Sequence, residues 1–258
     1  MSKSEIFSII FNSFKNFKKQ LSLHEPSISI SDINSVKNIL SKKLVSTSAE
    51  KIINKFEKKI SKLTKAKYVV ATNTGTSALH IALKAIQLKH NEEVLIPDIN
   101  YIAAANSVIH CGGIPHFVDI DITNLGIDAK KLDIYLKKIS IIKKNKLINK
   151  QSKNIIKAII PTHVFGNACD IVNLKRIAQK YKLFLIEDSS ESVGSFFKNK
   201  HLGTFGDIGV LSFNGNKIIT TGGGGAILTN NLKLFKKSLH LSKISRVKKK
   251  ILGIQLWW

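Results

Sequence analysis

The stretch YVVATNTGTSALHIALKAIQLKHNEEVLIP, residues 68–97, decides the fold class. It begins with the apolar run Tyr68–Ala71, passes through a polar turn, continues as the amphipathic segment Thr76–Leu88 and ends in the apolar run Val94–Ile96. Short apolar runs predict buried strands, and apolar residues spaced three and four apart predict a helix. A strand, a helix and a second strand in this order are typical of a parallel βαβ unit.

The same alternation continues along the chain to about residue 241, so we expect one α/β fold with a mostly parallel central sheet flanked by helices. Further strands are predicted over Pro115–Asp119, Ile155–Ile160, Leu183–Ile186, Gly209–Phe213 and Ala226–Thr229. Further helices are predicted over Tyr101–His110, Asp128–Lys138, Asp170–Tyr181 and Leu232–Leu241, with Asp170 as an N-cap. The Lys-, Asn- and Ser-rich stretch Lys143–Lys153 is interpreted as an exposed loop or insert.

Composition excludes several classes of protein. With 258 residues, 43% of them hydrophobic, the chain has enough apolar material for a core and is not disordered. No apolar run reaches the roughly 20 residues of a membrane span. Cys111 and Cys169 lie in no metal-binding or disulfide pattern, so we interpret both as reduced and structural, and we expect no metal.

The formal net charge of +24 suggests nucleic-acid binding, but the arginine content argues against it. Of the 41 basic residues, 39 are lysines and only Arg176 and Arg246 are arginines. Contacts to bases and phosphates favour arginine. We therefore interpret the lysines as a solvated surface and expect no nucleic-acid partner.

The first 22 residues predict an amphipathic helix without the apolar core and cleavage site of a signal peptide. Packing of this helix into the core is favoured over binding to a membrane surface. The sequence thus indicates a cytoplasmic protein with no membrane partner.

Polar clusters follow three of the predicted strands, where open α/β sheets usually bind ligands. The first, residues 72–77, places Gly75 before a helix whose free N–H groups could hold a phosphate, although an ordinary N-cap turn explains it equally well. The second, residues 187–191, places carboxylates after the run LFLI, where they could face a cationic ring nitrogen or a metal, or simply cap a turn.

The third cluster, residues 212–217, contains Lys217 between an apolar strand and the four glycines Gly222–Gly225. A lysine in such a half-buried place can act as a nucleophilic amine. The glycines allow close approach of the backbone, but a flexible hairpin would also explain them.

The three clusters together fit one cofactor. A phosphate cradle, a carboxylate for a pyridinium nitrogen and a lysine for an aldehyde describe pyridoxal 5′-phosphate. Tyr101 could supply an aromatic face for the ring, or could be a tyrosine of the core.

Several motifs together resemble one known family. They are LHEP, GTSAL, PDINY, THVFG, IEDSSESVGS, LGTFGDIGVLSFNGNK and TTGGGGAI, spread over residues 23–241. The chain resembles the DegT/StrS-type sugar-nucleotide aminotransferases, which share the aspartate aminotransferase fold, fold type I. The wording is most similar to the subgroup that acts on UDP-linked 4-keto-6-deoxy-N-acetylhexosamines for surface polysaccharide.

The resemblance implies a role for each site residue. Lys217 would bond to the cofactor aldehyde and later move a proton, Asp188 would pair with the pyridinium nitrogen, and Glu191 would lie near the phenolic oxygen. The phosphate would be held by Ser212 together with Gly75 and Thr76, and Tyr101 would stack on the ring. The resemblance also implies an amino-acid donor, glutamate, and a homodimer.

We expect three parts in the chain: the N-terminal helix over 1–22, the cofactor-binding large domain over 23–241, and a divergent basic tail over 242–258. The C-terminal small domain of the family is largely absent, and the A-rich codons expected for Lys248–Lys250 suggest a frameshifted or truncated product. The alternative function is therefore an inactive fragment that binds cofactor or a partner. His24 and Glu25 could lie near the substrate or in a surface loop, and His163 is interpreted as structural rather than as part of the site.

Overall fold

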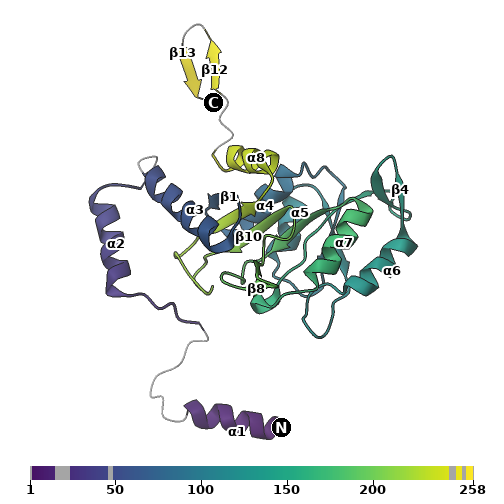
Figure 1. The fold of residues 1–258 in the computed structure, drawn as a ribbon, viewed down its shortest axis with the longest axis horizontal. Helices are drawn as coiled ribbons and strands as arrows, with labels where there is room; N and C mark the ends of the chain where they lie inside the picture. The colour runs from purple at the N-terminus through teal and green to yellow at the C-terminus, as the bar shows by residue number, and fades with distance from the viewer. Residues whose placement is uncertain (1, 15–23, 46–48, 244–247, 252–253, 258) are drawn as a thin grey trace.

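The structure is a computed structural model that describes residues 2–14, 24–45, 49–243, 248–251 and 254–257 (Figure 1). The helices are α1 Lys3–Phe14, α2 Ile30–Ser41, α3 Glu50–Thr64, α4 Gly75–Ala85, α5 Ala103–His110, α6 Ala129–Ile139, the 3₁₀ turn η2 Val164–Gly166, α7 Ile171–Tyr181 and α8 Leu232–Ser242. The first strands are β1 Tyr68–Thr72, β2 Glu93–Pro97, β3 Ile114–Val118, β4 Ser140–Lys143, β5 Lys146–Asn149 and β6 Ile155–Ile159. The remaining strands are β7 Phe184–Asp188, β8 Phe196–Phe197, β9 Lys200–His201, β10 Ile208–Ser212, β11 Gly225–Thr229, β12 Lys248–Ile251 and β13 Ile254–Trp257.

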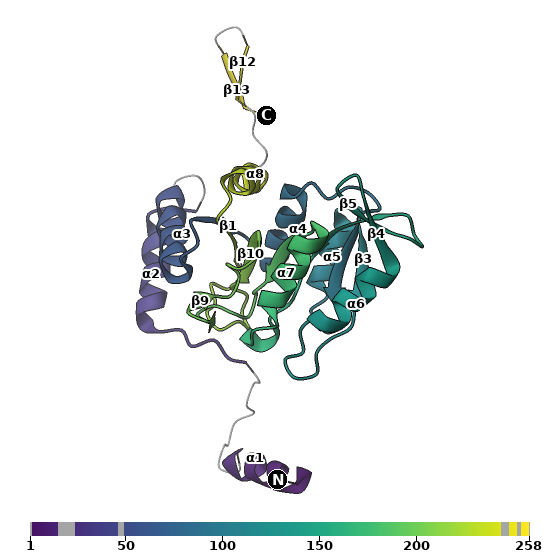
Figure 2. The same cartoon turned by 45° about the vertical axis from the view of Figure 1, so that its right-hand side comes forward.

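Nine strands form one mixed central sheet, in the order β1-β11-β10-β7-β6-β2-β3, with the β4–β5 hairpin attached to β6. The pairs β10–β7, β7–β6, β6–β2 and β2–β3 are parallel, whereas β11 runs antiparallel to both of its neighbours. Figure 2 shows β1 toward one end of the sheet and β3, β4 and β5 at the other. The α/β fold class is confirmed, and the reversed strands β11 and β5 make the sheet mixed.

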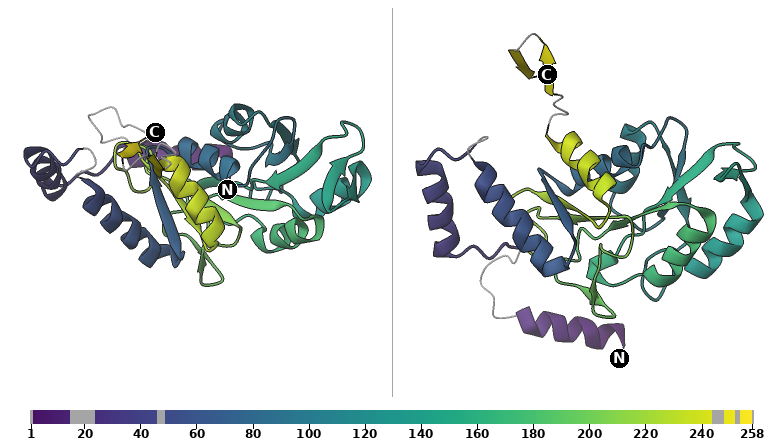
Figure 3. Two further views of the ribbon diagram at one scale, coloured as in Figure 1. Left: turned by 90° about the horizontal axis from the view of Figure 1, so that it is seen from above. Right: turned by 45° about the horizontal axis from the view of Figure 1, so that its top comes forward.

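Helices cover both faces of the sheet (Figure 3). On one face α4, α5 and α8 bury a core that includes Leu79, Leu83 and Val108. On the other face α6 and α7 bury a second core, and α3 packs against β1, β10 and β11. Because both faces are covered, the central strands β2 and β10 are buried along their whole length.

Polar N-caps define where the sheet-flanking helices begin. The side chains of Thr74, Asp128, Asp170 and Asn231 each accept a backbone N–H from the first turn of α4, α6, α7 and α8. An N-cap satisfies a donor that the helix leaves unpaired and contributes about 1 kcal/mol. The predicted cap at Asp170 is confirmed.

The predicted loop over Lys143–Lys153 is wrong in its first half, which forms the β4–β5 hairpin. Lys144 and Asn145 both have positive φ, the conformation of a type I′ turn that joins strands through two residues. Along β5, buried and more exposed side chains alternate, and Leu147 and Asn149 are the buried ones. The lysine-rich composition of the stretch obscures this pattern in the sequence. The hairpin therefore belongs to the sheet rather than to an exposed insert.

The first 60 residues and the tail contain elements that the sequence did not reveal. Helices α2 and α3 lie in the first part, and β12 and β13 pair as an antiparallel hairpin in the tail. The predicted N-terminal helix is present as α1, while residues 15–22 of that prediction lie outside the described residues. Cys111 and Cys169 are free and buried.

Helix α1 lies apart from the sheet domain in Figure 1, and its large apolar side chains are exposed. The interpretation of this helix as part of the core is therefore contradicted. Within the described part of the chain, no helix combines the length and the apolar character that crossing a membrane requires.

Candidate active site

The three polar clusters converge on one cavity of about 420 Å³. It lies at the carboxyl ends of β1, β2, β6, β7 and β10, where the loops that follow these strands come together. All the site residues that the sequence predicted line it: Gly75, Thr76, Tyr101, Asp188, Glu191, Ser212 and Lys217. The chemical role of each residue stays a prediction.

One wall of the cavity is the N-terminus of α4. Thr74 Oγ1 accepts the Ser77 N–H at 2.9 Å, which leaves the N–H groups of Gly75 and Thr76 at the cavity wall. The Ser212 hydroxyl lies beside them, and among the described residues no group forms a hydrogen bond with it. A Cβ at position 75 would lie 2.9 Å from Ser212 Cβ and 3.1 Å from Ser212 Oγ. Glycine therefore keeps open a space lined by donors, which suits an anion.

The glycine run closes this wall from the other side. Gly224, with φ of +147°, bridges to Thr74, and a Cβ at Gly225 would lie 2.4 Å from the Thr74 carbonyl oxygen. The glycines thus allow β11 and its preceding loop to press against the turn before α4. The alternative of a flexible hairpin does not describe Gly224 and Gly225, because Gly224 bridges to Thr74 and Gly225 pairs with both Thr72 and Ser212.

Asp188 ends β7 at the floor of the cavity and is buried. Its Oδ1 accepts the Ser190 N–H at 3.1 Å and the Ser190 hydroxyl at 2.6 Å. Burial raises the pKa of Asp188, against the opposing effects of these hydrogen bonds and of the Lys217 charge. A cation placed beside this carboxylate would offset the effect of burial, so Asp188 is suited to pair with a positively charged ring.

Lys217 reaches the cavity from the loop after β10, and 14% of its side chain is exposed. Its Nζ donates to Glu191 Oε1 at 3.0 Å, and Glu191 Oε2 accepts the Phe165 N–H at 2.9 Å. Glu191 therefore connects the lysine to the loop that carries η2. In that loop Gly166 has positive φ, and a Cβ there would lie 2.7 Å from the Glu191 carbonyl oxygen.

Tyr101 lies at the mouth of the cavity with 73% of its surface exposed, which excludes the reading as a core tyrosine. His163 lines the cavity but is buried and has partners at both ring nitrogens: Nε2 lies 3.1 Å from Glu187 Oε2, and Nδ1 accepts the Cys169 N–H. This agrees with the structural interpretation of His163. Glu187 also accepts the N–H groups of Gly203 and Gly206, so it holds a loop and does not reach the site.

Sequence reasoning missed two side chains of the site. Thr162 lines the cavity at the end of β6, and its hydroxyl is buried without a partner among the described residues. Ser190 fixes the Asp188 carboxylate. Both lie inside quoted motifs, THVFG and IEDSSESVGS, and a polar residue shortly after a buried strand was the signal that could have found Thr162.

A larger hollow of about 940 Å³ adjoins the cavity and shares Lys217 with it. Its walls are the segment around α2, which includes His24 and Glu25, and the loop over residues 215–222. The two residues left open in the sequence therefore line the same hollow as Lys217.

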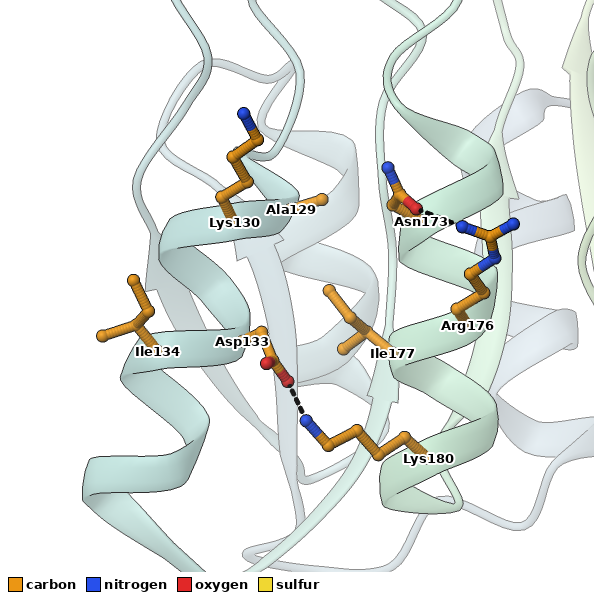
Figure 4. Close-up of a pocket in the computed structure, with 8 residues that line it drawn as sticks. All are labelled: Ala129, Lys130, Asp133, Ile134, Asn173, Arg176, Ile177 and Lys180. Carbon is orange, nitrogen blue, oxygen red and sulfur yellow. Dashed lines mark hydrogen bonds and ion pairs between the residues drawn. The ribbon is translucent and has the colours of Figure 1, made fainter.

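A separate groove of about 500 Å³ lies between α6 and α7 (Figure 4). Ala129 and Ile177 point into it from the two helices, and an ion pair between Asp133 and Lys180 crosses it. It contains none of the predicted site residues.

Comparison with known proteins places this geometry in a family. The sequence pattern of the DegT/DnrJ/EryC1/StrS aminotransferase family matches residues 26–254, and the chain belongs to this family. The match extends into the segment that the sequence analysis set apart as a divergent tail.

Curated relatives and solved structures agree with this assignment. A GDP-perosamine synthase of Escherichia coli O157:H7 is 35% identical over 222 residues, covering 86% of this chain and 56% of the relative. A GDP-perosamine synthase of Caulobacter vibrioides is 38% identical over 191 residues, covering 74% and 47%. The structure of an aminotransferase from Psychrobacter cryohalolentis matches with a TM-score of 0.78 at 26% identity, covering 90% of this chain and 57% of that one. The chain thus spans about half the length of the curated relatives it matches.

Proposed function

We propose that the protein is a pyridoxal-phosphate-dependent aminotransferase that transfers an amino group to a keto group of a nucleotide-linked sugar. The observation that carries the proposal is the cavity that joins the α4 N-terminus, Asp188 and Lys217, inside a fold shared with aminotransferases. Solved structures with the same fold include a protein of Streptococcus pneumoniae in its pyridoxamine-phosphate form.

The residues of the cavity fit this cofactor. The N–H groups of Gly75 and Thr76 and the Ser212 hydroxyl would hold its phosphate, since a helix N-terminus favours an anion. Asp188 would hold the ring nitrogen in its protonated form, and Tyr101 would cover the ring. Thr162, with its unpartnered buried hydroxyl, provides a further hydrogen-bonding group in the same wall.

When bound, pyridoxal phosphate supplies an aldehyde that combines with amines and a ring that accepts electron density. Lys217 Nζ is the amine of this chain placed to hold the aldehyde and, once released, to move a proton to the sugar carbon. Glu191 orients that amine through its 3.0 Å hydrogen bond. Glu191 also accepts the Phe165 N–H, so its carboxylate joins Lys217 to the loop that carries η2.

The acceptor is proposed to be a nucleoside-diphosphate 4-keto-6-deoxy sugar, with glutamate as donor. The motif wording favours a UDP-linked N-acetylhexosamine, whereas the two relatives described above are named for a GDP-linked sugar. The hollow that shares Lys217 is the place for the sugar nucleotide. Parallel assays with UDP-linked and GDP-linked 4-keto-6-deoxy sugars, each with glutamate, distinguish the two.

We also propose that a second copy of the chain covers the mouth of the site. Apolar side chains are exposed around the site: Tyr101 and Phe165, which line the cavity, are 73% and 79% exposed, and Ile218 and Ile219, which line the adjoining hollow, are exposed as well. Contiguous exposed apolar side chains around a site mark an interface. Light scattering that gives a dimer would support this, and a monomer at micromolar concentration would contradict it.

The absorption spectrum of the 258-residue protein with pyridoxal phosphate, before and after borohydride, tests the cofactor site. We expect a visible band that borohydride removes, with the cofactor mass fixed on the peptide that contains Lys217. Lys217→Ala should lose the band, and the control Lys233→Ala, at an exposed position of α8, should keep it. A folded protein without the band would favour a fragment that lacks the cofactor site, and a band that glutamate does not remove would favour the alternative of an inactive fragment that binds cofactor.

A further inference from the structure

The loop that carries η2 has a strained backbone at the candidate active site. Phe165 has a φ of +52°, in the left-handed region that residues with a Cβ rarely adopt. Of the described residues other than glycine that have positive φ, it is the only aromatic one and the only one that lines this cavity. Strain of this kind persists only where neighbouring groups hold it, and it is found at functional sites.

Contacts with Glu191 hold Phe165 in this conformation. Packing of its own side chain contributes little, because 79% of the residue is exposed. The Phe165 N–H donates to Glu191 Oε2 at 2.9 Å. The next residue, Gly166, lies against the backbone of Glu191, where a Cβ would be 2.7 Å from the carbonyl oxygen. The loop is thus fixed to the side chain and to the backbone of Glu191.

The Glu191 carboxylate is in turn oriented by Lys217. Its Oε1 accepts from Lys217 Nζ at 3.0 Å, and 36% of the Glu191 side chain is exposed. Among the described residues, the carboxylate forms hydrogen bonds only with Lys217 and Phe165. A charged pair at this distance fixes the direction of a carboxylate for which water would otherwise compete. The hold on the loop therefore depends on the state of the lysine.

The state of Lys217 changes during the reaction proposed above, and the inference that follows rests on that proposed function. A free lysine carries three N–H groups and a positive charge. When its nitrogen bonds to the aldehyde carbon of pyridoxal phosphate, the aldehyde oxygen leaves as water with two of the three hydrogens. The remaining hydrogen and the charge then lie beside the oxygen on the adjacent ring carbon. Glu191 Oε1 is left without a comparable partner.

We propose that Glu191 couples the η2 loop to Lys217, so that the loop is held while the amine is free and released while the amine is bonded to the cofactor. Glu191 is then a positioning residue that gives the site two loop conformations. The amine is free in the form that meets the keto sugar, and bonded in the form that meets the amino donor. The keto sugar thus meets the held loop and the donor meets the released loop, in which Phe165 leaves positive φ.

Hydrogen exchange of the full chain, read on the peptide that contains residues 163–167, tests this proposal. The states compared are the cofactor-free protein and its complexes with pyridoxamine phosphate and with pyridoxal phosphate. Pyridoxamine phosphate is the matched ligand, because it keeps the ring and the phosphate but has no aldehyde. We expect the Phe165 amide to exchange about tenfold faster with pyridoxal phosphate than with pyridoxamine phosphate, which corresponds to the loss of one hydrogen bond to a charged group.

Two variants remove the coupling, and a third is the control. Glu191→Gln has one acceptor oxygen, which cannot accept from both Lys217 and Phe165, so exchange should be fast in all three states. Lys217→Ala should give fast exchange in the cofactor-free protein, because Glu191 has lost its partner. The control is Glu57→Gln: Glu57 also accepts a backbone N–H, from Ala71 at 2.9 Å, but it lies outside the cavity. This variant should keep the difference between the two complexes.

The visible band separates failure of this inference from failure of the proposed function. If the band forms and borohydride fixes the cofactor on Lys217, equal exchange of residues 163–167 in the two complexes overturns the coupling alone. Slow exchange of this peptide in cofactor-free Lys217→Ala also overturns it, whatever the cofactor does. A wild-type protein that forms no band overturns the proposed function and the coupling together.

Discussion

Gly75 is the residue at which backbone space determines ligand binding. A methyl group there would lie 2.9 Å from Ser212 Cβ and crowd the hydroxyl that faces the phosphate position. We expect Gly75→Ala to weaken pyridoxal-phosphate binding about tenfold or more while the protein stays folded. Gly215→Ala is the control, because a Cβ there meets no atom within 4 Å. The affinity of each variant for pyridoxal phosphate is measured by titration of the visible band. Equal affinities would contradict a phosphate site beside Gly75 and Ser212.

The protonation of Asp188 in the candidate active site affects the stability of the folded protein. Burial raises its pKa above the usual 3.8, so the folded, cofactor-free protein disfavours the carboxylate that exists at neutral pH. The stability that Asp188 contributes therefore falls as pH rises through and above 3.8. We expect Asp188→Asn, which can still accept from Ser190, to raise Tm of the cofactor-free protein at pH 7 and to have little effect near pH 4.

The same substitution should weaken cofactor binding, because a neutral amide can accept a hydrogen bond from the protonated ring nitrogen but forms no ion pair with it. Differential scanning at the two pH values, with and without pyridoxal phosphate, measures both effects. If Asp188→Asn instead lowers the Tm of the cofactor-free protein at pH 7, the inference that the buried Asp188 carboxylate destabilises this state is wrong.

Among individual residues, sequence reasoning found the groups that are recognisable by chemical type in a motif. A lysine before four glycines and an acid after a buried strand carry such a signal, and both line the cavity. Thr162 carries only the weak signal of a polar residue shortly after a buried strand, and Ser190 carries none, because serines and threonines occur throughout the chain. Only the end of β6 and the fold of the loop after β7 give them their place.

At the scale of elements, the β4–β5 hairpin is fastened to the sheet by a buried carboxylate. Glu93 at the start of β2 accepts from Asn149 and from the Ser152 hydroxyl, and lies 2.7 Å from His116 Nδ1. Burial alone would raise the pKa of Glu93, but these hydrogen bonds prevail and lower it to about 2. The hairpin thus depends on a charge that strong acid removes.

We expect acid unfolding to show this dependence. A lowered pKa contributes stability that is present above about pH 4.5 and is lost as pH falls from there to about 2, which amounts to roughly 3 kcal/mol. Glu93→Gln should therefore lower the free energy of unfolding at pH 7 and flatten its decrease across that window. Urea unfolding at several pH values measures it, and parallel curves for the two proteins would contradict the assignment.

Element boundaries between residues 66 and 243 followed from periodicity, because apolar runs and capped amphipathic segments alternate there. The hairpin and the helices α2 and α3 did not. Lysine-rich strands with one inward side chain in two resemble loops, and α2 has no buried residue to mark its face. Contacts with distant residues such as Glu93 define the hairpin, and a local pattern does not contain them.

At the scale of the whole molecule, the charge of +24 opposes folding through mutual repulsion of lysines. The Debye length shortens from about 20 Å at 20 mM salt to about 4 Å at 500 mM, so repulsion between surface charges is then screened. We expect Tm to rise by a few degrees over this range. Acetate in place of chloride should give the same rise, and a falling Tm would show that ion pairs outweigh repulsion.

Strand β1 has a consequence for the time course of folding. It sits at the end of the sheet and pairs there only with β11, so that Tyr68 faces Thr229 across 229 − 68 = 161 residues of chain. Closing so long a loop is entropically unfavourable and makes such contacts form late. During synthesis the strand must wait, with its edge unpaired, until β11 has emerged from the ribosome. Pulse-labelled hydrogen exchange should accordingly show amides of β1 protected after those of β2 and β6, and this interval is when the nascent chain is most exposed to aggregation.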